Sequence, residues 1–101
     1  MKFKLFRAPE GLDKHVLKHE LVAVENGSDI HAVADLLVKA VSHDLSDLPQ
    51  FEGYDTTAYP PEPIQLSRRV KRYKYEMTGV VMPKYGKENL LMDYGIIEEA
   101  E

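Results

Sequence analysis

The chain has 101 residues, of which 44% are hydrophobic and 30% charged, and its formal net charge is −4. This size and composition indicate one globular domain with a single core rather than a disordered chain, and we treat residues 1–101 as one domain. The chain has no cysteine, which excludes disulfide scaffolds, thiol nucleophiles and cysteine-ligated metal sites. No apolar run approaches the ~20 residues that a membrane-spanning helix needs, and the charged N-terminus is not followed by the apolar segment of a secretory signal. We therefore expect a cytoplasmic protein without membrane association.

The first quarter of the chain contains two strand patterns. Residues 2–7 alternate lysines with apolar side chains, which predicts a short strand, and residues 8–11 carry a proline and a glycine typical of a turn. Residues 14–25 are ambiguous, because their apolar positions also fit a helical stripe that would end at Gly27. The β-branched run at residues 21–24 and the following Asn-Gly pair favour a strand, and the helical alternative stays open.

The clearest element is a helix over residues 29–43. Ser28 is a natural N-cap, and Asp29 places negative charge in the first turn, where the helix dipole favours it. An apolar stripe at helical spacing follows, and it consists of Ile30, Val33, Ala34, Leu37, Ala40 and Val41. We expect this stripe to pack on a sheet.

Residues 44–66 predict a long connection rich in proline. Residues 60–63 read Pro-Pro-Glu-Pro, which favours an extended path and cannot join a central strand. Phe51, Tyr54 and Tyr59 are interspersed in this segment. These aromatic residues suit a protein-contact loop, because they offer a large area at low entropy cost. The alternative is that the rings fold back over the core of so small a domain.

The last third of the chain predicts a hairpin. Residues 67–82 are compatible with a long strand, residues 84–87 with a turn, and residues 88–98 with a final strand. Residues 98–101 predict a solvated acidic tail. The resulting fold is a small α+β domain of order β-β-α-β-β, with an antiparallel sheet and one helix (about 29–43) on one face. The apolar content of residues 77–97 exceeds what one short helix buries, so we expect a homodimer or another protein partner.

The basic segment at residues 68–74 holds five of the thirteen lysines and arginines. A cationic strand with tyrosines suits single-stranded nucleic acid, whose phosphates need cations and whose bases stack on rings. An acidic protein surface is another possible partner, and the common structural use of such charge is to protect an edge strand from aggregation. The candidate contact residues are Arg68, Arg69, Lys71, Arg72, Tyr73, Lys74 and Tyr75.

The residues do not favour an enzyme or a metal site. His15 and His19 have the i, i+4 spacing of metal ligands only if residues 14–25 are helical, and no convincing third ligand is present. Ser42, His43 and Asp44 are consecutive, which carries little weight because catalytic triads assemble in space rather than in sequence. We therefore expect no catalytic residue, cofactor or metal. The predicted function is a non-enzymatic accessory protein that acts through protein–protein contacts, and the alternative is single-stranded nucleic-acid binding through residues 67–75.

Overall fold

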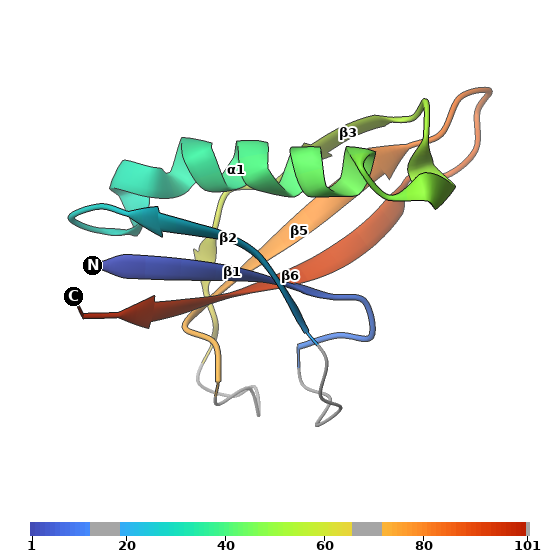
Figure 1. Ribbon diagram of the computed structural model, residues 1–101. Helices are drawn as coiled ribbons and strands as arrows, with labels where there is room; N and C mark the ends of the chain where they lie inside the picture. The colour runs from blue at the N-terminus through green and yellow to red at the C-terminus, as the bar shows by residue number, and fades with distance from the viewer. Residues whose placement is uncertain (13–18, 66–71, 101) are drawn as a thin grey trace.

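The computed structural model describes residues 1–12, 19–65 and 72–100. Within these residues one α-helix packs on one face of a curled antiparallel sheet of six strands (Figure 1). The strands are β1 (Lys2–Ala8), β2 (Glu20–Asn26), β3 (Asp55–Ala58), β4 (Glu62–Pro63), β5 (Tyr75–Met82) and β6 (Leu90–Glu99), and the helix is α1 (Ile30–Ser46). The predicted small α+β domain is therefore confirmed.

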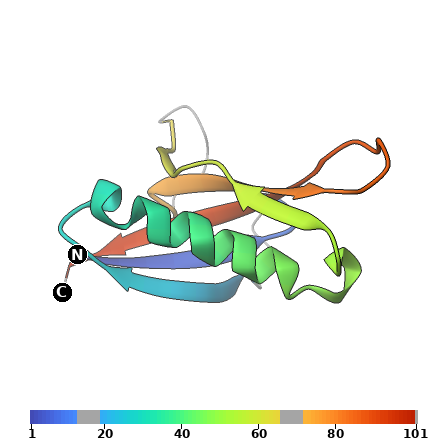
Figure 2. The ribbon, with the colours of Figure 1, turned by 90° about the horizontal axis from the view of Figure 1, so that it is seen from above.

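The sheet combines the two expected hairpins. The strand order is β2-β1-β6-β5-β3, and β4 also pairs with β5. β1 pairs with β2 and β5 pairs with β6, as predicted, while the central contact joins β1 to β6, from opposite ends of the chain. Residues 20–26 form the strand favoured by their β-branched run; most of the residues before them in the ambiguous segment lie outside the described part. Seen from above, α1 crosses the sheet (Figure 2).

The helix is longer than predicted and begins with a different cap. The N-cap is Asp29 instead of Ser28, and its carboxylate accepts a 2.9 Å hydrogen bond from the backbone N–H of Ala32. An aspartate satisfies a free N–H of the first turn as well as a serine does, and its charge also complements the helix dipole. At the other end the helix continues to Ser46, which brings Leu45 into the buried stripe.

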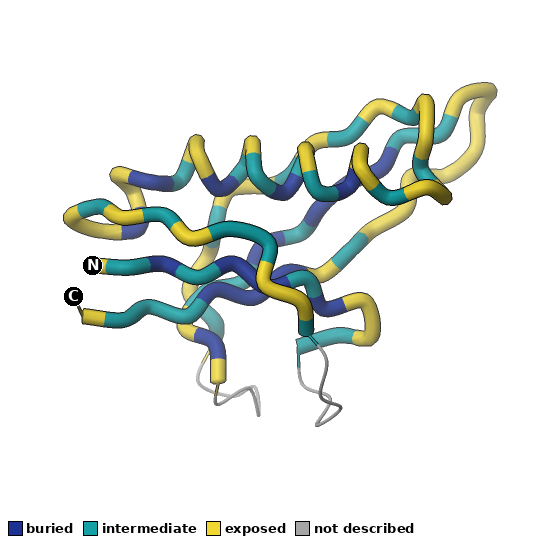
Figure 3. The backbone as a smooth tube through the Cα atoms, viewed as in Figure 1, coloured by how far each residue is buried: buried dark blue, intermediate teal, exposed yellow. Residues whose placement is uncertain are grey.

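The main core lies between α1 and the sheet, and Figure 3 shows that buried residues line the side of α1 that faces the sheet and the middle of the sheet strands. Each fully buried leucine, valine or phenylalanine stabilises the fold by ~1.5–3 kcal/mol. The core comprises Phe3, Leu5, Ile30, Val33, Leu37, Val41, Leu45, Met77, Val81, Tyr94 and Ile96. The alternation predicted for residues 2–7 places Phe3 and Leu5 in this layer.

Residues 44–65 differ from the long connection that the prolines predict. After the last turn of α1 they form a short 3₁₀ helix (Pro49–Phe51) and the two strands β3 and β4. Ser42 on the helix and Thr56 on β3 hold these elements together, because each hydroxyl donates to the other residue's backbone carbonyl, at 3.0 and 2.9 Å. Both β3 and β4 pair with the same strand, β5, so they form one interrupted edge of the sheet. Proline lacks the donor that a central strand needs, which confines this segment to an edge.

The predicted boundaries of the last two strands also shift. β5 begins at Tyr75 instead of residue 67, so Arg72, Tyr73 and Lys74 precede it. β6 continues to Glu99, and the expected solvated tail is therefore partly strand. Glu99 forms an ion pair with Lys4, in which Lys4 Nζ lies 3.2 Å from Glu99 Oε1. Pairing with β1 explains the extension, because Lys2 and Phe3 lie opposite Glu99 and Glu98.

Candidate functional site

The basic segment is described only at its C-terminal end. Arg68, Arg69 and Lys71 lie outside the described residues. Because residues 72–74 precede β5, they do not alternate between two sheet faces as an extended strand would. The cationic strand surface expected for nucleic acid is therefore absent from residues 72–74.

Tyr73 is buried against the sheet face opposite α1. Its side chain is 5% exposed, and its ring packs beside Phe6 with the ring centroids 5.9 Å apart. The ring fills the space above Gly95, where a Cβ atom would lie only 2.6 Å from Tyr73 Cγ. Gly95 stands between two residues that face the helix, Tyr94 and Ile96, so its own position belongs to the opposite face. Tyr73 is thus part of a small second core and is covered.

Two polar side chains complete this second core. His19 Nδ1 and the Tyr73 hydroxyl share a hydrogen bond, and the two rings stack. The Arg72 guanidinium lies 4.9 Å from the centre of the Phe6 ring and 5.5 Å from that of Tyr73. Burial raises the pKa of the Tyr73 hydroxyl, and the positive charge of Arg72 opposes that shift. Arg72 is therefore exposed to solvent on one side and makes cation–π contacts with both aromatic rings on the other.

Lys74 and Tyr75 are engaged on the helix side of the sheet. Lys74 donates to Glu98, and this hydrogen bond is the main reason why the pKa of Lys74 is raised. The ring of Tyr75 contacts Phe3 edge-on, with centroids 6.4 Å apart. The structure therefore does not bring the four described residues of the predicted contact set onto one surface.

The three aromatic residues of the predicted contact loop separate into two groups. Phe51 and Tyr54 are partly buried and pack against the main core, as the alternative interpretation expected. Tyr59 is 63% exposed and follows β3 at the proline-rich edge. The loop thus contributes one accessible ring instead of an aromatic patch.

The end of the β5–β6 hairpin extends beyond the rest of the sheet, as Figure 1 shows. We call residues 82–92 the arm. Pairing with β3 stops at Met82 of β5, and pairing with β1 stops at Asp93 of β6. The arm exposes three large apolar side chains: Tyr85 is 97% exposed, Leu91 67% and Leu90 46%. Leu90 and Leu91 are consecutive in a strand, so they point to opposite faces of the arm. The apolar excess in residues 77–97 indicated such a surface, but not its location.

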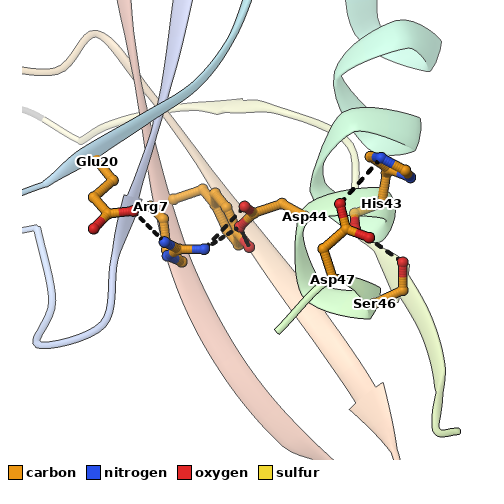
Figure 4. A network of polar contacts seen from close by, with 7 residues as sticks. Arg7, Glu20, His43, Asp44, Ser46 and Asp47 are labelled. Atoms are coloured by element: carbon orange, nitrogen blue, oxygen red, sulfur yellow. Dashed lines mark hydrogen bonds and ion pairs between the residues drawn. The ribbon is translucent and has the colours of Figure 1, made fainter. Parts of the chain in front are cut away.

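A polar cluster that the sequence pattern did not reveal joins α1 to the sheet (Figure 4). The Arg7 guanidinium donates to both oxygens of Asp44, at 2.9 and 3.1 Å, and also to Glu20 at 2.5 Å. The Tyr94 hydroxyl donates to Asp44 Oδ2 at 2.6 Å. The side chains of Arg7 and Asp44 are only 14% and 15% exposed. With its donors and acceptors paired, this cluster serves as a structural clamp.

The clamp predicts an alkaline loss of stability. Burial, followed by the hydrogen bond to Asp44, raises the pKa of Tyr94 far above its usual value of 10.0. A raised pKa favours the protonated folded state, so this stabilisation is complete below pH ~10 and is lost as the pH rises above that value. We expect the free energy of unfolding to fall more steeply above pH ~10 in the wild type than in Tyr94→Phe. Urea denaturation at several pH values measures this difference, and equal slopes would contradict it.

Within the described residues, no group of three or more histidine or acidic side chains is placed to hold a metal ion. His15 lies outside these residues, and His19 contacts Tyr73 as described above. In the same part of the chain, no helix has the length and apolar character to cross a membrane. Comparison of the chain with protein-family models, with curated proteins and with solved structures found no match.

Proposed function

We propose that this chain is a non-enzymatic binding protein that acts through protein–protein contacts made by the arm. The observation that carries this proposal is the exposure of Tyr85, Leu90 and Leu91 on a hairpin that extends beyond the sheet. Exposure of large apolar side chains to water is unfavourable, and their burial against a partner is favourable, on either face of the arm. A tyrosine at the tip also provides the rigid aromatic anchor that is enriched at interfaces.

The described part of the basic segment supports nucleic-acid binding less well. Base stacking requires an accessible ring, whereas Tyr73 is covered, and phosphate binding requires free cations, whereas Lys74 is paired with Glu98. Arg72 contributes one exposed charge. Nucleic-acid binding is therefore the second outcome that the experiments must distinguish.

The test compares two leucine substitutions in affinity capture from an extract of the source cells. Leu91→Asp places a charge on the arm, and Leu36→Asp places the same charge on α1, where the leucine is 47% exposed. We expect the wild type and Leu36→Asp to capture the same partner, and Leu91→Asp to lose at least 10-fold, because a buried unpaired charge at an interface costs more than ~1.4 kcal/mol. Equal capture by the two variants would contradict a role for the arm.

A second measurement addresses nucleic acid directly. Fluorescence polarisation of labelled single-stranded DNA and RNA is titrated at low and at physiological salt, with the wild type and with Arg72→Glu. Among the described residues of the basic segment, Arg72 alone has an exposed charge that forms no ion pair with a described carboxylate. Because one cation can neutralise only one phosphate, we expect no salt-sensitive binding. If the wild type bound tightly at low salt and Arg72→Glu bound more weakly, nucleic-acid binding would replace protein–protein contact as the better-supported function.

A further inference from the structure

We propose that the partner of the arm is a second copy of this chain, which pairs β6 with β6 in an antiparallel, two-fold arrangement centred on Leu90. This inference rests on the proposed function, and it identifies both the occupant and the register of the contact. Three features of the arm support it: an uncovered backbone edge, a self-complementary hydrogen-bond pattern and a self-complementary charge pattern.

The uncovered edge follows from the register of the sheet. The Thr78 carbonyl accepts from the backbone N–H of Tyr59, so Thr78 points away from β6 and its neighbour Gly79 points toward β6. Gly79 lies opposite Met92, and backbone direction alternates along a strand, so the N–H and C=O of Leu91 point away from β5. On that side β1 ends opposite Asp93, and the chain after β1 turns away from the arm in Figure 1. Among the described strands, none covers Leu91 on this side.

Of the two registers centred on the exposed leucines of β6, the one centred on Leu90 uses this edge better. When the two-fold axis passes through Leu90, Leu91 of each copy faces Asn89 of the other. Asn89 directly precedes β6, and with the alternation of the strand continued to it, each such pair exchanges two backbone hydrogen bonds, about four in all. A register centred on Leu91 would form about two, because Asn89 would then face Asp93. The backbone edge of Asp93 is already occupied by Ala8 of β1. The axis at Leu90 therefore satisfies more of the open groups, and it packs the two Leu90 side chains against each other.

The charges agree with the same register. Lys87 and Asp93 are three residues to either side of Leu90, so the two-fold operation brings Lys87 of one copy toward Asp93 of the other at both ends of the contact. Because Ala8 of β1 occupies the backbone edge of Asp93, the long lysine side chain, and not the lysine backbone, makes this approach. Both side chains are exposed, and neither forms an ion pair with a described residue. The apolar centre is thus flanked by opposite charges. The edge strand β2 is less suitable for self-pairing than the end of β6, because it carries Glu20 and Glu25 without a cation and its register is interrupted by a bulge.

The absence of cysteine allows a direct test of the register. In a central pair without mutual hydrogen bonds, the two Cα atoms are ~4.5 Å apart, which lies within the range that a disulfide spans. We expect Leu90→Cys to form a covalent dimer under mild oxidation at least 10-fold faster than Leu36→Cys, whose leucine is similarly exposed at 47% against 46%. Equal rates would overturn the proposed register.

Sedimentation equilibrium of the full chain tests the charge pattern. We expect the wild type and Lys39→Glu, a surface control on α1, to dimerise with the same dissociation constant. Lys87→Glu and Asp93→Lys should each raise the dissociation constant severalfold. The double variant should return the dissociation constant to the wild-type value, because exchanging both charges re-forms the pairs. A wild type that stays monomeric up to ~1 mM would overturn the inference. If Leu91→Asp nevertheless loses partner capture, docking of a different protein remains supported; if capture is also unchanged, the proposed function fails as well.

Discussion

Replacing Asp44 with alanine is expected to lower the free energy of unfolding by ~3 kcal/mol. The carboxylate accepts hydrogen bonds from Arg7 on β1 and from Tyr94 on β6, and it is itself on α1. Its removal leaves a largely buried hydroxyl without an acceptor and a guanidinium with only Glu20 as its partner. Urea denaturation followed by circular dichroism measures the change.

Two variants control this prediction. Asp44→Asn keeps an acceptor for the Tyr94 hydroxyl and removes the charge, so it should fall between the wild type and alanine. Asp47→Ala removes an aspartate whose ion pair with His43 is exposed, with side-chain exposures of 68% and 79%. An exposed pair of this kind contributes ~0–1 kcal/mol. If Asp47→Ala destabilised the protein as much as Asp44→Ala, the burial of the clamp would not be the cause.

Gly79→Ala is expected to destabilise the protein by ~2 kcal/mol through steric crowding. A Cβ atom at this position of β5 would lie 2.7 Å from Leu45 Cδ1, 3.0 Å from Val41 Cγ1 and 3.1 Å from Tyr94 Cε1. All three neighbours are fully buried, so none can move into open space. The glycine allows the last turns of α1 to approach the sheet closely.

A double-mutant cycle tests the assigned cause. Leu45→Ala alone should cost ~2–5 kcal/mol, because it leaves a cavity in the core. In the double variant, the new methyl group at position 79 occupies part of that cavity. The two losses should therefore sum to more than the loss of the double variant, by at least ~0.5 kcal/mol. Additive losses would show that the effect of the alanine does not arise from contact with Leu45.

Local patterns in the sequence predict the parts of the fold that depend on near neighbours. Three patterns each predict an element with one buried face, and each of these elements forms. They are the alternation in residues 2–7, the helical stripe from Ile30 to Val41 and the hairpin pattern near the C-terminus. These features are encoded at spacings of two to four residues, so they can be read without the tertiary structure.

The tertiary structure decides what depends on distant partners. The prolines of residues 60–63 indicate only an extended path, and the edge of β5 turns that path into β3 and β4. Tyr73 lies outside β5, although the sequence predicts a strand there. Its ring is instead buried on the far face of the sheet, where Gly95 has no side chain and leaves space for it. The clamp joins Arg7, Asp44 and Tyr94 across separations of 37 and 50 residues, and no local pattern records such pairs. The sequence by itself thus determined which surfaces had to be buried, whereas long-range packing decided which of the basic and aromatic side chains remain exposed.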